Sequence, residues 1–72
     1  MPHTVLVTGA TGFVGSHVAE ALIRHGDTVR ALARAGADAT LLERLGAQII
    51  RGDLAEPTSL KTAVEGIDVV VH

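Results

Sequence analysis

The organisation of this chain follows from the stretch VLVTGATGFVG at residues 5–15. It begins with aliphatic residues typical of a buried strand, passes two glycines, and reaches a third inside a pattern typical of an amphipathic helix. The spacing G-x-x-G-x-x-G is a variant of the strand–turn–helix fingerprint that binds dinucleotides. Glycines also mark ordinary turns, but here a strand pattern precedes them and a helix pattern follows. We therefore predict a nucleotide-binding turn.

Each glycine of this turn is expected to serve a different purpose. Gly9 lets the chain leave the strand through a tight turn, Gly12 lets a pyrophosphate approach the backbone, and Gly15 lets the helix pack closely on the strand. The phosphates would face the free N–H groups and the positive dipole end of a helix that starts near Phe13. The cofactor-binding residues predicted here are Gly9, Thr11, Gly12, Phe13, Val14 and Gly15.

The composition favours a small domain with an aliphatic core. Of 72 residues, 47% are hydrophobic, and Phe13 is the only aromatic residue among Phe, Trp and Tyr. The net charge of −2 offers no basic surface for nucleic acid or an anionic membrane. The absence of cysteine excludes disulfides and thiolate chemistry. Because no apolar run approaches transmembrane length and Met1 leads directly toward a strand rather than a signal peptide, a cytoplasmic location is expected.

Strand and helix patterns alternate along the whole chain. Strands are predicted at 4–8, 28–33, 48–51 and 67–72. Helices are predicted at 12–25, between a cap at Asp38 and a stop at Gly46, and from Pro57 until Gly66 stops the third. The predicted apolar faces of the helices are Val14, Val18, Ala21 and Leu22, then Leu41, Leu42 and Leu45, then Leu60, Ala63 and Val64. This alternation predicts an α/β fold with a parallel sheet.

The end of the second strand bears on the choice of cofactor. NAD-binding turns of this kind usually carry an acidic residue about 20 residues beyond the glycines, where it holds the ribose 2′-hydroxyl. Ala33 stands there instead, and Arg34 follows. A guanidinium beside a small residue admits a 2′-phosphate and binds it bidentately, which favours NADP. The alternative is that Arg34 is a solvated loop residue, and Arg30 is a weaker candidate because strand alternation turns it elsewhere.

The segment TGATGFVG at residues 8–15 resembles the T-G-A-T-G-F-[IV]-G signature of the extended short-chain dehydrogenase/reductases, which include epimerases and dehydratases. The resemblance continues through GDL at 52–54 and DVVVH at 68–72. It implies the first half of a Rossmann fold, with three layers and strand order 3-2-1-4. It also implies that Asp53 accepts a hydrogen bond from adenine while the Leu54 N–H reaches the ring. The alternative for Asp53 is a simple Asx turn.

The catalytic Tyr-x-x-x-Lys motif of that family is absent from these 72 residues, because they contain no tyrosine and Lys61 is the only lysine. No catalytic residue is therefore predicted, and these residues alone are expected to bind a cofactor without turning over a substrate. The histidines lack metal-ligand spacing and are expected to be solvated; they are His3, His17, His25 and His72.

The leading hypothesis is a half-domain that binds a nicotinamide dinucleotide, NADP in preference to NAD, for an oxidoreductase or epimerase. The alternative is a non-catalytic NADP-sensing or self-associating structural module. Three consecutive valines at residues 69–71 are expected to leave an exposed apolar sheet edge. We expect this edge to pair with a second copy of the chain, as a homo-oligomer, or with a C-terminal half.

Overall fold

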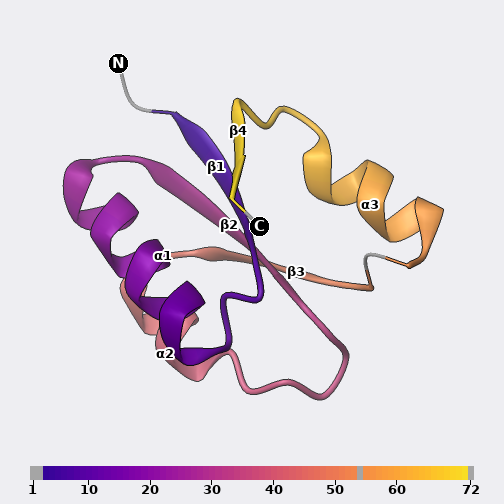
Figure 1. The fold of residues 1–72 in the computed structure, drawn as a ribbon, viewed down its shortest axis with the longest axis horizontal. Coiled ribbons are helices and arrows are strands. Elements are labelled where there is room, and N and C mark those ends of the chain that lie inside the picture. The colour runs from indigo at the N-terminus through magenta and orange to yellow at the C-terminus, as the bar shows by residue number, and fades with distance from the viewer. Residues whose placement is uncertain (1–2, 54, 72) are drawn as a thin grey trace.

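A single parallel sheet with helices on both faces makes up the computed structural model, which describes residues 3–53 and 55–71 (Figure 1). Its strands lie in the order third, second, first, fourth along the chain, which confirms the predicted half-Rossmann topology. The predictions made for Leu54 and His72 lie outside the described residues. The elements in chain order are β1 (Thr4–Thr8), α1 (Phe13–His25), β2 (Thr28–Ala33), α2 (Thr40–Leu45), β3 (Gln48–Arg51), α3 (Pro57–Val64) and β4 (Val69–Val71).

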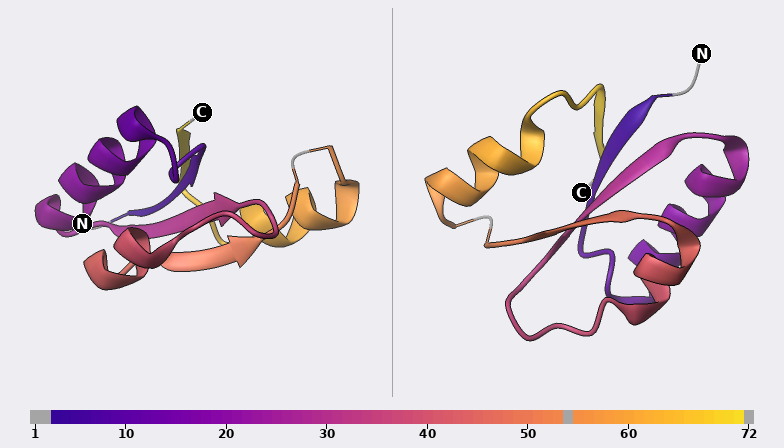
Figure 2. Two further views of the ribbon diagram at one scale, coloured as in Figure 1. Left: turned by 90° about the horizontal axis from the view of Figure 1, so that it is seen from below. Right: turned by 180° about the vertical axis from the view of Figure 1, so that it is seen from behind.

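The helices form two unequal layers on the sheet. Helices α1 and α2 lie together over one face, and α3 lies over the other (Figure 2). Side chains of a strand alternate between faces, so β1 sends Val5 and Val7 toward α1 and α2 and Leu6 toward α3. The first core is completed by Ala10, Ala19, Val29, Ala31, Ala39 and Leu42, the second by Leu32 and Ala63.

The face that α1 turns to the sheet agrees only in part with the predicted one. Leu22 packs against the core as predicted and Ala19 is fully buried, whereas Val14 is 72% exposed and Ala21 is also exposed. Placing Val14 and Ala21 on the buried face was wrong.

Gly15 explains this rotation of α1. A Cβ at Gly15 would overlap the carbonyl oxygen of Gly9 and would lie 2.9 Å from Ala10 Cα. The helix therefore touches the turn at Gly15, and its buried face continues four and seven positions later, at Ala19 and Leu22.

Two glycines end α1 and α2 as predicted. Gly26 (φ 104°) and Gly46 (φ 94°) adopt the left-handed conformation in which the terminal carbonyls are satisfied. The start of α2 differs by one residue from the prediction, since Ala39 occupies the N-cap position. Asp38 precedes it and accepts hydrogen bonds from the N–H (3.0 Å) and hydroxyl (2.6 Å) of Thr40.

Helix α3 is less buried than predicted. Pro57 begins it and Ala63 is fully buried, but Leu60 and Val64 are each 40% exposed. Strand β4 is also shorter than predicted. Asp68, placed in the strand by the sequence pattern, instead accepts a hydrogen bond from the Thr4 N–H through its carboxylate (2.8 Å).

Within the described residues, no helix is both long and apolar enough to cross a bilayer.

Candidate functional site

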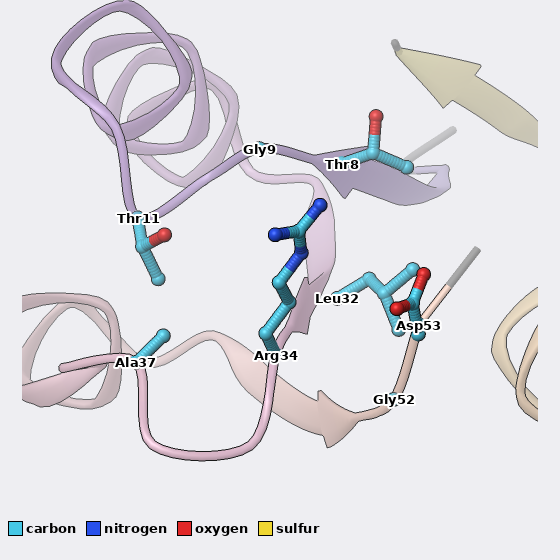
Figure 3. Close-up of a pocket in the computed structure, with 8 residues that line it drawn as sticks. All are labelled: Thr8, Gly9, Thr11, Leu32, Arg34, Ala37, Gly52 and Asp53. Carbon is cyan, nitrogen blue, oxygen red and sulfur yellow. The ribbon is translucent and has the colours of Figure 1, made fainter. Parts of the chain in front are cut away.

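A pocket of about 500 Å³ opens where β1, β2 and β3 end (Figure 3). In open α/β sheets, ligands bind outside the carboxyl ends of the strands where the strand order reverses, and here the order reverses at β1, which lies between β2 and β4. The volume suits a small ligand or part of a larger one. The lining residues are Thr8, Gly9, Thr11, Leu32, Arg34, Ala37, Gly52 and Asp53.

The three glycines of the turn differ in how strongly the fold requires a residue without a side chain. Gly9 has φ +65°, a conformation that L side chains rarely adopt, and Gly15 leaves no room for a Cβ against the turn. Gly12 has an ordinary extended backbone (φ −80°, ψ 172°), and its N–H donates to the Gly9 carbonyl at 3.0 Å. Among the described residues, a Cβ at Gly12 would approach only the Gly9 carbonyl oxygen, at 3.3 Å. The fold therefore needs glycine at positions 9 and 15 much more than at position 12.

The amino terminus of α1 lies beside this turn and is open to an anion. Within the described residues, Gly12 at the N-cap brings no capping side chain, and the first turn of α1 contains no acidic residue. The first N–H groups of a helix have no partner within the helix, and they carry the positive end of its dipole. A phosphate is a suitable partner for such groups.

Phe13 and Val14 flank this helix end. Phe13 is 80% exposed, and its ring meets His17 edge-on at 4.6 Å between ring centroids. The side chains of Phe13 and Val14 do not line the pocket. Any contact of these two residues with phosphate would be through the backbone.

Arg34 follows β2 and points its guanidinium into the pocket, between Thr11 and Leu32 (Figure 3). Ala33 is 2% exposed and belongs to the core instead of lining the pocket. The turn after Arg34 is closed by a hydrogen bond from the Ala37 N–H to the Arg34 carbonyl (3.0 Å), with Gly36 at φ +86°. Arg34 therefore presents a cation to the space enclosed by the glycine turn.

Arg30 has a different role, as strand alternation predicted. It lies beside Leu6 on the face covered by α3, and its Nη1 donates to the carbonyls of Ala63 (3.0 Å) and Glu65 (2.6 Å). This guanidinium therefore holds the carboxyl end of α3 on the sheet and lies away from the pocket.

Asp53 lines the pocket and forms the Asx turn that was the alternative prediction. Its Oδ1 accepts the Ala55 N–H at 2.9 Å, and its carbonyl accepts the Glu56 N–H at 2.9 Å. One carboxylate oxygen is thus engaged locally while the side chain borders the pocket (Figure 3). Asp53 and Arg34 give the pocket one negative and one positive side chain.

The structure brings four of the predicted site residues together in the pocket lining: Gly9, Thr11, Arg34 and Asp53. Sequence reasoning missed four other lining residues: Thr8, Leu32, Ala37 and Gly52. Thr8 and Leu32 could have been found, because they are paired in register at the ends of neighbouring strands. Gly52 is explained by the close approach of α3, since a Cβ there would lie 2.6 Å from the Ser59 hydroxyl. The described residues contain no group of three or more His, Asp or Glu side chains able to hold a metal.

This fold and turn define the class of dinucleotide-binding α/β proteins to which the short-chain dehydrogenase/reductases belong. Within that class the chain belongs to the NmrA-like family, whose family model matches residues 1–72.

Curated relatives support this placement. The chain is 39% identical over 69 residues to sterol demethylase protein B of Methylococcus capsulatus, which covers 96% of this chain and 21% of the relative. It is 41% identical over 66 residues to 2-alkyl-3-oxoalkanoate reductase of Shewanella oneidensis, covering 92% of this chain and 16% of the relative. The chain thus spans about a fifth of the length of such relatives or less.

Solved structures share the fold. AtPrR2 with NADP+ and (+)pinoresinol superposes with a TM-score of 0.83 at 35% identity, over 97% of this chain and 25% of that chain. A short-chain dehydrogenase/reductase superfamily protein from Agrobacterium tumefaciens with bound NAD gives a TM-score of 0.76 at 34% identity, over 97% of this chain and 20% of that chain. The predicted resemblance to this superfamily is confirmed.

Proposed function

We propose that this chain holds a nicotinamide dinucleotide, NADP in preference to NAD, as the cofactor-binding part of an oxidoreductase or epimerase. The observation that carries the proposal is Gly12. Its backbone conformation suits any residue, and beyond its chain neighbours a Cβ would meet only the Gly9 carbonyl oxygen, at a tight 3.3 Å, so the fold itself gives less reason for a glycine here than at positions 9 and 15. A ligand that comes close to the backbone gives that reason, and a pyrophosphate on the amino terminus of α1 is such a ligand.

Arg34 supports the preference for NADP. The relatives include structures with NADP+ and with NAD, so likeness alone favours neither cofactor. The Arg34 guanidinium points into the pocket, where it is available for a 2′-phosphate, and Ala33 stands where NAD-binding turns carry the carboxylate that holds the 2′-hydroxyl. Asp53 and the backbone of residues 52–53 border the same pocket and would contact the adenine end.

When bound, the nicotinamide ring would supply hydride transfer, and the residues described here would fix the dinucleotide by its phosphates and adenosine. In relatives of this kind the chain matches about a fifth of the length, and the residues that act on a substrate would lie outside that matched part.

Two substitutions test the site by calorimetric titration. Gly12→Val should abolish dinucleotide binding, because a branched side chain would occupy the phosphate position, whereas Ala21→Val on the exposed face of α1 should leave affinity unchanged. Unchanged affinity in folded Gly12→Val would overturn the assignment of the phosphate site.

Arg34→Ala should weaken NADP by roughly 10- to 150-fold, the equivalent of a charged hydrogen bond of about 1.5–3 kcal/mol, and leave NAD nearly unchanged. Arg44→Ala removes the same charge from an exposed position of α2 and serves as the control. Equal weakening of both dinucleotides would show that Arg34 does not read the 2′-phosphate.

A second proposal, self-association, is favoured by β4. Val69 and Val70 are 44% and 53% exposed on the end strand of the sheet. Two copies pairing along β4 would cover these valines and satisfy the strand edge. Sedimentation should show a dimer of this chain that Val70→Lys dissociates. A strictly monomeric wild-type chain at high micromolar concentration would refute the pairing.

A further inference from the structure

Arg51, at the end of β3, ties down the turn that carries Arg34. Its Nη1 donates to the carbonyls of Arg34 (3.0 Å) and Ala37 (2.6 Å). The register of the sheet explains this reach: Arg51 pairs with Ala33, the residue directly before the turn. Arg51 stands two positions after Ile49, which packs on the core under α1 and α2, so the two side chains share a face of the sheet, the one to which the turn leads.

The turn at residues 34–37 has few other anchors. Its first three residues are exposed, and Ala37 is half-buried. The next buried side chain is Ala39, which is 3% exposed. Inside the turn there is one backbone hydrogen bond, from Ala37 to Arg34. A segment with so little burial opens at low free-energy cost unless something outside it holds it in place.

The position of Arg34 depends on that turn. Its backbone carbonyl accepts both the Ala37 N–H and Arg51 Nη1, while its guanidinium points into the pocket (Figure 3). Arg51 does not itself line the pocket. Its effect on a ligand would therefore be exerted through the backbone of the residue that does.

We propose that Arg51 is a positioning residue for cofactor choice: by fixing the turn at residues 34–37, it orients Arg34 toward a 2′-phosphate. This rests on the proposed function, because it requires a dinucleotide whose 2′-phosphate meets Arg34. It adds a residue of β3 to the determinants of that choice. Preorganisation of this kind raises affinity by removing the ordering cost from the binding step.

The test compares Arg51→Met with Arg51→Lys. Methionine keeps much of the aliphatic length and removes every donor. Lysine keeps a charged nitrogen, and because both hydrogen bonds come from a single nitrogen of Arg51, an ammonium group can replace them. The readout is the ratio of the dissociation constants for NAD and NADP. We expect this ratio to fall about tenfold in Arg51→Met and to recover in Arg51→Lys.

Two controls separate this role from others. Arg44→Met loses the same charge at an exposed position and should keep the wild-type ratio. In the Arg34→Ala background, Arg51→Met should change the ratio no further, because Arg51 acts through Arg34. A further fall in that background would overturn the proposal, since it would show that Arg51 acts on the phosphate directly.

The remaining outcomes are also decisive. A wild-type preference for NADP that Arg51→Met leaves intact overturns the role of Arg51 and leaves the proposed function standing. A wild-type chain without any preference overturns both. Should Arg51→Met not fold, Arg51→Gln, which is polar but two atoms shorter than arginine along the side chain, replaces it with the same expectation.

Discussion

The two faces of the sheet are held in different ways. Under α1 and α2, eight buried residues form one apolar core, whereas under α3 only three do. On the α3 side, Leu60 and Val64 remain 40% exposed. The carboxyl end of α3 is held on the sheet by polar contacts, because Arg30 donates hydrogen bonds to two carbonyls at that end.

This difference indicates which part of the molecule is rigid. Gly15 presses α1 onto the glycine turn, so the turn is attached to the well-packed face. The α3 face depends on one guanidinium and a small core, and it is the layer expected to open first. The part of the proposed cofactor site that lies at the glycine turn therefore rests on the more stable layer.

The largest expected effect comes from a matched pair of leucines. Leu42 on α2 is 2% exposed and Leu60 on α3 is 40% exposed. Leu42→Ala should lower the free energy of unfolding by about 2–5 kcal/mol, because it leaves a cavity in the larger core. Leu60→Ala should cost about 1 kcal/mol or less. Urea unfolding of both variants measures the difference, and equal losses would show that the two layers are packed alike.

A smaller effect is expected from removing the hydrogen bonds that Arg30 donates to the carboxyl end of α3. Arg30→Met should lower stability by about 1–3 kcal/mol, the usual cost of removing a charged donor from its acceptors. Hydrogen exchange should rise in α3 while α1 keeps its protection. Loss of protection in α1 to the same extent would mean that the two layers unfold as one unit.

The smallest effect is expected at Asp27, before β2. The pKa of Asp27 lies below its usual 3.8, chiefly because the His3 backbone N–H donates to its carboxylate, with a further contribution from His25. A carboxylate with a lowered folded pKa stabilises the protein above the unfolded value, and this stability is lost as the pH falls through the folded pKa. Asp27→Asn should thus be less stable than wild type at neutral pH, and the gap should close in acid below pH 3.8. A gap that persists there would exclude ionisation as its cause.

The order of the helices and strands could be predicted because apolar periodicity and glycines at turns follow the local backbone conformation. The strand order was predicted from the family resemblance. The buried face of α1 could be predicted only in part: Leu22 was placed there correctly, but apolar character favoured Val14, whereas the contact at Gly15 turns the helix toward Ala19. Arg34 was predicted from its position after a strand, and Asp53 from the family resemblance of the GDL segment at residues 52–54. Arg51 was not predicted, because it donates to carbonyls of the turn after β2, at Arg34 and Ala37, and no local sequence pattern encodes that contact.

The most direct test of the central claim is a calorimetric titration of this chain with NADP and, in parallel, with NAD. If Gly12 and Arg34 form the site proposed for them, NADP will bind with a measurable heat and at least about tenfold more tightly than NAD. No heat with either dinucleotide, from a chain shown to be folded, would contradict the account and would leave the glycine turn with an architectural role alone.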